Sequence, residues 1–150
     1  AQDTSTVVEV CLDVLKDTDD DLFCCLYATA ALLSIETIRS SYQRFIMEES
    51  DVLMGVSSYK YSPISALIVK ESGNASLLLK EFEDSQSQSH PQLRASNGTF
   101  YWAKKKSFMK EKTFYSSSLR VLDVQEDEVC DLDTKEDYLN LQKKYEASHI

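Results

Sequence analysis

The sequence predicts an α/β domain in which helices pack on a parallel sheet. Short, continuous apolar runs of strand length alternate along the chain with segments whose apolar residues recur at helical spacing. The 150 residues, 43% of them hydrophobic and only three of them glycine and two proline, suffice for one compact domain with a real core. We therefore expect a single domain over residues 1–150.

The first two elements are expected to be a helix and a buried strand. Thr6 and Glu9 have the spacing of a capping box, and apolar residues at helical spacing follow, which predicts a helix over residues 6–15. The acidic run "DTDDD" ends this helix. The next segment, "LFCCLYAT" at residues 22–29, is continuously apolar, which is typical of a strand covered on both faces.

A second helix and a second buried strand follow. Ser34 can cap a helix that runs to about Glu49, and "VLMGVSSY" at residues 52–59 has the composition of a buried strand. A strand, a helix and a strand with short connections form a right-handed parallel crossover in nearly all known cases. The residues expected on the inner face of this helix are Ile38, Tyr42, Phe45 and Ile46.

The character of the sequence changes at Pro63. Two apolar segments flank the turn-rich "ESGNA", which predicts an antiparallel hairpin inserted into the α/β domain at about residues 63–82. The polar stretch at residues 83–92 is expected to be a loop, long enough to suggest a role at a site.

The remaining third of the chain predicts two strands and two helices. "GTFYWAKK" and "SLRVLDV" read as strands, and the short "SFMKE" between them reads as a helix. The final helix is expected after Thr134, whose hydroxyl can cap it together with Asp137. Its inward residues are expected to be Tyr138, Leu141 and Tyr145.

Charge and cysteine usage limit the possible partners. The 25 acidic and 16 basic residues give a net charge of −9, which repels nucleic-acid phosphate, so no nucleic-acid partner is expected. The four cysteines lack the paired spacing of a zinc site and lie in apolar runs, which indicates a reduced, cytoplasmic protein. No apolar stretch approaches the ~20 residues that span a bilayer and no signal peptide opens the chain, so no membrane partner is expected.

Two carboxylates near the end of the chain form a candidate metal site. Asp131 and Asp133 flank Leu132, and on an extended segment the side chains at i and i+2 point to the same side. If an apolar strand ends here, both oxygens lie at the sheet edge where α/β proteins bind ligands. One or two carboxylates suit Mg²⁺, although acidic residues before a helix also stabilise its positive N-terminal dipole. The residues alone leave both interpretations open.

Four segments carry a resemblance to a known family. "CCLYATAALLS", "NGTFYWAKK", "FYSSSLRVLDV" and "EVCDLDTKEDYL", in this order and spacing, resemble the acylneuraminate cytidylyltransferases. The pairing of "YATA" with "FYW" is most similar to the pseudaminic acid branch, and "D-x-D-T-x-E-D" is the most specific element. The resemblance covers essentially the whole chain. It implies a three-layer, Rossmann-like nucleotidyltransferase sheet of the nucleotide-diphospho-sugar transferase type, with the hairpin as a dimerisation element.

The resemblance also implies a reaction and a set of site residues. Members of the family transfer CMP from CTP to the anomeric hydroxyl of a nine-carbon sugar acid and release pyrophosphate, without a covalent nucleophile. By this resemblance Asp131 and Asp133 bind Mg²⁺, and Tyr27 and Thr29 line the sugar pocket. The positions expected near the acyl-sugar are Gln88, Asn97 and Tyr101.

The chain also departs from the family pattern. Family members begin with a strand and an Arg/Gly/Lys-rich loop that cradles the triphosphate, and that region would lie before residue 1. Ala31 stands where the family has a proline, and Gln86 stands where an arginine is expected. We therefore expect an incomplete sheet that binds CTP poorly alone and that forms a homodimer or a complex with a separate N-terminal half.

Three interpretations of this pattern remain open. The chain is the carboxyl-terminal portion of a split or shortened cytidylyltransferase, or it is a non-catalytic, degenerate relative that serves as an interaction and dimerisation module. The third interpretation is another sugar nucleotidyltransferase, such as one that activates a 3-deoxy-octulosonate.

Overall fold

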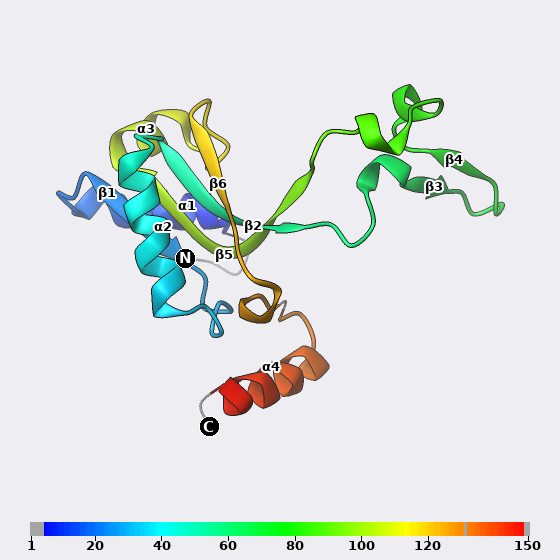
Figure 1. Ribbon diagram of the computed structural model, residues 1–150. Helices are drawn as coiled ribbons and strands as arrows, with labels where there is room; N and C mark the ends of the chain where they lie inside the picture. Colours follow the sequence, from blue (N-terminus) through cyan, green and yellow to red (C-terminus); the bar gives the residue numbers. More distant parts are fainter. Residues whose placement is uncertain (1–4, 131, 149–150) are drawn as a thin grey trace. The chain divides into compact units, whose positions relative to one another are not determined.

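A computed structural model describes residues 5–130 and 132–148 of the chain (Figure 1). The chain divides into two compact units, one formed by Ala1–Ser57 with Ser96–Ile150 and the other by Ser58–Ala95. The second unit contains the predicted insert at 63–82 and extends it at both ends.

The first unit contains a four-stranded sheet in the order β1-β5-β2-β6. β1 is antiparallel to β5, and β2 is parallel to β6. Asn97 bonds to Ser57 while the Lys104 amide bonds to the Asp51 carbonyl, so β5 is also antiparallel to β2. β1 and β2, which α2 connects, therefore run parallel to each other as predicted, but the antiparallel strand β5 lies between them, so the sheet is mixed rather than parallel throughout. The strands are β1 (Leu22–Leu26), β2 (Val52–Ser58), β5 (Arg94–Lys104) and β6 (Leu119–Asp123).

Burial differs sharply between the two strands that the sequence predicts to be covered on both faces. Val52 to Val56 of β2 are all buried, which confirms that prediction. β1 is an edge strand whose residues are only half-buried, and Leu26 is 55% exposed, so the same prediction is wrong for β1. An apolar run indicates a strand but does not reveal how many neighbours that strand has.

In the part of the first unit that the structure describes there are four α-helices, and α1 and α2 begin at the predicted caps. Thr6 and Glu9 form the complete capping box of α1, and the Ser34 side chain accepts the Thr37 amide at the start of α2, which confirms both predictions. A 3-10 helix, η1 (Leu15–Asp17), continues α1, and another, η5 (Glu126–Glu128), follows β6. The α-helices are α1 (Val7–Val14), α2 (Ile35–Met47), α3 (Lys105–Glu111) and α4 (Lys135–Ser148).

The helices cover both faces of the sheet, so the unit has three layers. Tyr101 packs in a cluster with Phe108 of α3 and with side chains of α1, whereas Trp102 contacts Tyr42 and Phe45 of α2. Neighbouring residues of a strand point to opposite faces, so α1 and α3 lie opposite α2. The α/β, three-layer class expected from the sequence is confirmed.

Two predicted helix faces are narrower than expected. In α2 only Ser41 and Phe45 are buried, whereas Tyr42 and Ile46 are 43% and 46% exposed. The hydroxyl of Ser41 can be buried because it accepts a 2.9 Å hydrogen bond from Nε1 of Trp102. In α4 Leu141 is buried, whereas Tyr138 and Tyr145 are about half exposed. Periodicity identifies residues that share a face but not how much of that face a neighbour covers.

The second unit contains the predicted hairpin (Figure 1). β3 (Leu67–Val69) pairs antiparallel with β4 (Ala75–Leu77). Gly73 adopts φ +84° in the turn, and its amide donates to the Lys70 carbonyl at 2.8 Å. Three 3-10 turns complete the unit, namely η2 (Pro63–Ser65), η3 (Lys80–Phe82) and η4 (Ser87–Ser89).

Over residues 5–130 and 132–148, no helix has both the length and the apolar character needed to cross a membrane.

Candidate functional site

Polar and aromatic side chains gather at the end of the sheet where β1 and β2 finish. Tyr27 directly follows β1, and its amide donates to the Thr99 carbonyl of β5 at 3.1 Å. Ser57 lies near the carboxyl end of β2, where Asn97 of β5 meets it. In open α/β sheets, ligands bind outside the carboxyl ends of parallel strands. This edge of the first unit is therefore the candidate site.

Asn97 connects β2 and β5 at this edge. Its Nδ2 donates to Oγ of Ser57 at 3.1 Å, and its Oδ1 accepts from Oγ1 of Thr99 at 2.6 Å and from the Thr99 amide at 3.3 Å. Thr99 is only 3% exposed, so its hydroxyl depends on this partner. The contacts show Asn97 as a side chain that holds the start of β5 in place. Its predicted contact with an acyl-sugar stays a prediction.

Tyr101 is a buried residue of β5, and its hydroxyl is directed to Ser96. The Tyr101 hydroxyl is 2.7 Å from Oγ of Ser96, and its ring stacks on Phe114 with centroids 4.4 Å apart. The side chain is only 9% exposed, so Tyr101 belongs to the core and presents little surface to a ligand. Its ring centroid lies 5.7 Å from that of Tyr27, which brings two of the predicted sugar-pocket residues together.

Tyr27 covers the start of β5. Burial, followed by a hydrogen bond with Tyr101, raises the pKa of the Tyr27 phenol well above its ordinary value. The phenol therefore stays protonated at neutral pH and serves as a hydrogen-bond donor rather than as a base. Gly98 makes the approach of this ring possible, because a Cβ at that position would lie 3.3 Å from two Tyr27 ring carbons.

Tyr27 and Thr29 line a pocket of about 330 Å³ between the end of β1 and α1. The other lining residues include Cys11 of α1 and Cys25 of β1. This pocket is the cavity nearest to the residues that the resemblance assigns to sugar binding. Gln88, the remaining predicted substrate residue, lies exposed on η4 in the second unit.

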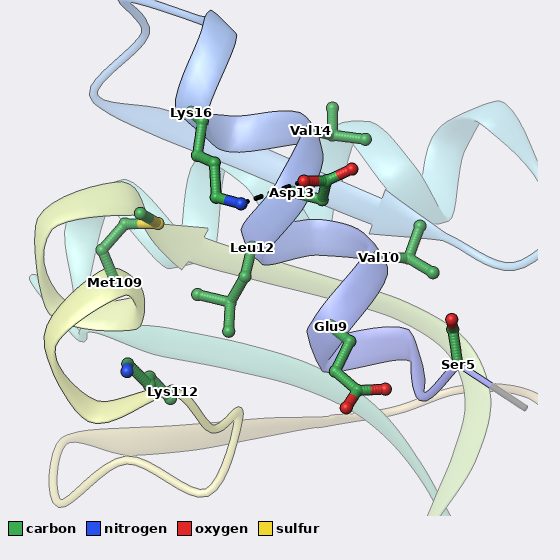
Figure 2. A pocket seen from close by; sticks show the side chains of 9 residues that line it. All are labelled: Ser5, Glu9, Val10, Leu12, Asp13, Val14, Lys16, Met109 and Lys112. Carbon is green, nitrogen blue, oxygen red and sulfur yellow. Dashed lines mark hydrogen bonds and ion pairs between the residues drawn. The ribbon is translucent and has the colours of Figure 1, made fainter. Parts of the chain in front are cut away.

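A second pocket, of about 770 Å³, runs along the other side of α1 and reaches α3 (Figure 2). Figure 2 shows Leu12 between α1 and the α3 residue Met109, with Lys16 directed to Asp13. Lys16 and Asp13 form a 3.0 Å ion pair, and Glu9 is bound in the capping box of α1. None of the predicted site residues lines this pocket, and three of its charged groups already have partners. Its volume alone therefore does not mark it as the site.

An acidic segment follows β6 and is attached to the N-terminus of α2. The Glu128 carboxylate accepts the Ser34 amide at 3.2 Å and the Thr37 hydroxyl at 2.7 Å. Because α2 begins after the loop that leaves β1, this contact holds the segment at the same end of the sheet as Tyr27. Glu128 caps the positive end of a helix dipole, which is a structural use of its charge.

Asp133 follows this segment and is exposed in a bend before α4. The predicted cap of α4 is confirmed: Oδ2 of Asp137 accepts from the Thr134 amide and hydroxyl at 2.8 and 2.7 Å. These hydrogen bonds lower the pKa of the Asp137 carboxyl, the bond from the Thr134 side chain contributing most. Asp137 is therefore committed to the helix cap, whereas Asp133 faces solvent.

The metal pair is predicted at Asp131 and Asp133, and Asp131 lies outside the described residues. The strand expected to precede the pair is wrong: β6 ends at Asp123, the Val124 amide still bonds to the Val56 carbonyl, and then η5 begins. Within the described residues, no group of three or more histidine, cysteine or acidic side chains is placed to hold a metal. The assignment of Asp131 and Asp133 to Mg²⁺ stays a prediction.

Sequence reasoning missed several residues that build this edge. Ser57, Ser96 and Thr99 provide the hydrogen-bond partners of Asn97 and Tyr101, and Gly98 provides the space for Tyr27. One signal was available, because a glycine inside a strand pattern indicates a close approach by another group.

Several known proteins are similar to this chain in sequence or in fold. No protein-family model matches the chain. A pseudaminic acid cytidylyltransferase of Campylobacter jejuni serotype O:2 is 26% identical over 148 residues, which cover 97% of this chain and 64% of that protein. The chain is therefore similar in sequence to proteins named pseudaminic acid cytidylyltransferase. A second such protein, from C. jejuni serotype O:23/36, is 25% identical over the same shares of both chains.

A third relative and a solved structure extend the comparison. The Helicobacter pylori protein named pseudaminic acid cytidylyltransferase and UDP-2,4-diacetamido-2,4,6-trideoxy-beta-L-altropyranose hydrolase is 25% identical over 88% of this chain and 26% of its own length. A 4-diphosphocytidyl-2C-methyl-D-erythritol synthase from Anaerococcus prevotii has a TM-score of 0.64 at 10% identity, over 95% of this chain and 68% of that chain. The structural likeness shows the fold alone. The chain spans about two thirds of the length of the Campylobacter cytidylyltransferases.

Proposed function

We propose that this chain is part of a cytidylyltransferase that transfers CMP from CTP to a nine-carbon sugar acid of the pseudaminic type. The observation that carries the proposal is the relationship over 97% of the chain to proteins named pseudaminic acid cytidylyltransferase. The mixed α/β sheet, with its polar edge at the ends of β1 and β2, is a scaffold that suits this chemistry.

In the proposed reaction, the anomeric hydroxyl oxygen of the sugar acid forms a bond to the α-phosphorus of CTP. The bond from that phosphorus to the bridging oxygen breaks, pyrophosphate leaves, and the hydroxyl proton passes to solvent or a base. Such a transfer requires positioning and charge stabilisation rather than a covalent nucleophile. None of the described residues is required to act as a covalent nucleophile.

Tyr27 and Thr29 are the residues that would contact the sugar acid. Both line the pocket of about 330 Å³, to which α1 contributes Val7 and Val10. The protonated Tyr27 phenol would donate a hydrogen bond to a sugar oxygen, and Thr29 would add a second hydroxyl. Tyr101 and Asn97 would act indirectly. Tyr101 would hold the Tyr27 ring in position, and Asn97 would hold the start of β5.

Mg²⁺ is the cofactor that this proposal requires, and the donor set at Asp131 and Asp133 is suited to it. Carboxylates are hard oxygen ligands, and Mg²⁺ commonly takes only one or two of them with waters and phosphate oxygens. When bound, the ion would supply neutralisation of charge on the phosphate oxygens. A bound cation would also offset the repulsion between a triphosphate and a chain with a net charge of −9.

A dimer through the β3–β4 hairpin is part of the proposal. Leu67, Ile68 and Val69 of β3 are 60%, 48% and 68% exposed, which is unusual for three consecutive apolar residues of a strand. A second copy would cover this apolar strand. Sedimentation of the chain and of a Leu67→Lys, Val69→Lys variant measures it: we expect a dimer that the variant converts to monomer, and a monomeric parent chain would contradict the proposal.

The proposed function is tested by pyrophosphate release from CTP with pseudaminic, legionaminic and sialic acids, using the full-length protein. We expect release with pseudaminic acid above the other two, and a loss of at least about tenfold in Asp133→Asn. Asp127→Asn, an equally exposed acidic residue on η5, is the matched control and should keep parental activity. Absence of release with all three acids would overturn the proposed function.

A further inference from the structure

Two cysteines from different elements share the pocket that Tyr27 and Thr29 line. Cys11 is on α1 and Cys25 is on β1, and both side chains line the cavity of about 330 Å³. Both are free, half-buried, and packed against the aromatic cluster that includes Tyr101 and Phe108. A small molecule that enters the pocket therefore meets both sulfur atoms.

The two thiols interact with each other, and the interaction shifts their pKa values in opposite directions. Interaction with the Cys25 thiol lowers the pKa of Cys11. Interaction with Cys11, followed by burial, raises the pKa of Cys25. Of the two cysteines that share the pocket, Cys11 is therefore the one whose thiol ionises more readily, and the thiolate is the reactive form.

We infer that Cys11 and Cys25 form an oxidisable dithiol site in this pocket, with a hydroperoxide as its substrate. The Cys11 thiolate attacks one oxygen of hydrogen peroxide, the O–O bond breaks, and hydroxide leaves, so that Cys11 becomes a sulfenic acid. Once Cys11 is a sulfenic acid, its thiolate no longer disfavours ionisation of Cys25. Cys25 loses its proton, its sulfur attacks the Cys11 sulfur, the S–O bond breaks, and the hydroxide that leaves takes up a proton to give water. The two sulfur atoms are oxidised to one disulfide, and the peroxide is reduced to water.

The neighbouring cysteine of β1 provides an internal comparison. Cys24 and Cys25 are adjacent on a strand, so their side chains point to opposite faces of the sheet. Cys24 does not line the pocket, and burial raises its pKa to about 11. It is therefore expected to stay reduced while its neighbour reacts.

The disulfide would tie α1 to β1 directly beside the pocket. Cys25 lies two residues before Tyr27, so the bond would fix the wall from which Tyr27 extends. Any effect of this bond on sugar binding rests on the proposed function. The oxidation itself does not, and its test measures chemistry on sulfur rather than CMP transfer.

The test treats the folded, reduced chain with hydrogen peroxide and maps the products after trypsin digestion. We expect a peptide ending at Lys16 to be joined to the peptide that contains Cys24 and Cys25, with fragmentation placing the bond at Cys25. In Cys25→Ser, oxidation should stop at a Cys11 sulfenic acid that dimedone captures. Cys24→Ser is the matched control and should form the same bond as the parent. Four unmodified thiols, a Cys11–Cys24 bond, or bonds only between chains would overturn the inference.

A second measurement does not depend on whether Cys25→Ser folds. Limiting iodoacetamide on the native parent chain should label Cys11 first, at least about tenfold faster than Cys24, because the thiolate is the reacting form. Labelling of Cys24 before Cys11 would overturn the inference.

Discussion

Replacing Gly98 by alanine tests how the Tyr27 side of the site is built. Gly98 has φ +63°, in the left-handed region where an L-residue costs about 1–2 kcal/mol. The added Cβ would also lie 3.3 Å from two carbons of the Tyr27 ring, so the ring must move. That crowding adds about 1 kcal/mol. The expected loss in the free energy of unfolding is therefore about 2–3 kcal/mol.

The assay follows urea unfolding by the fluorescence of Trp102, the single tryptophan of the chain, which lies on β5 of the first unit. Combining Gly98→Ala with Tyr27→Ala separates the two contributions. In that background the ring is absent, so Gly98→Ala should cost only the backbone strain of about 1–2 kcal/mol. A Gly98→Ala chain as stable as its parent would refute the reasoning, and so would an equal cost in both backgrounds.

Two further predictions concern the sheet and the last helix. A Cβ at Gly55 of β2 would collide with Oγ1 of Thr99 on β5. Gly55→Ala should therefore lower the free energy of unfolding by about 1–3 kcal/mol, measured from the urea midpoint. An unchanged midpoint would contradict this prediction, because it would mean that Thr99 moves aside without cost. The Thr134 hydrogen bonds depress the pKa of Asp137 in the folded chain, so their contribution is present above the ordinary carboxyl pKa and is lost as pH falls through the depressed value. NMR titration of the Asp137 carboxyl should give a higher pKa in Thr134→Ala than in the parent chain, because the hydroxyl bond is lost while the Thr134 amide bond remains. Identical titrations would contradict the cap.

Local features of the fold follow from local sequence. The capping box at Thr6 and Glu9, the Ser34 cap and the hairpin around Gly73 each depend on residues a few positions apart, and the structure contains all of them. The order of the strands depends on contacts between distant segments, which no local pattern records. That is why β1 proved to be an edge strand paired with an antiparallel β5.

The candidate site, like the fold, could be predicted from the sequence only in part. The resemblance assigns Tyr27, Thr29, Asn97, Tyr101 and Gln88 to substrate binding, and this assignment stays a prediction. The structure places the first four at or beside one edge of the sheet and Gln88 on η4 of the second unit. The resemblance did not reveal that Tyr101 is a core residue, or that the side-chain amide of Asn97 is hydrogen-bonded to Ser57 and Thr99. Those roles depend on which hydrogen-bond partners folding brings close, and the partners are small hydroxyl residues with no distinctive pattern of their own.

The most direct test of CMP transfer is phosphorus NMR of a mixture of the full-length protein, CTP, Mg²⁺ and pseudaminic acid. Transfer predicts that the phosphodiester signal of a CMP-sugar and the signal of pyrophosphate grow together. The pyrophosphate signal should be about twice as intense, because that molecule contains two equivalent phosphorus atoms, and Asp133→Asn should slow the growth of both. Unchanged CTP, or free CMP without the phosphodiester signal, would contradict the account.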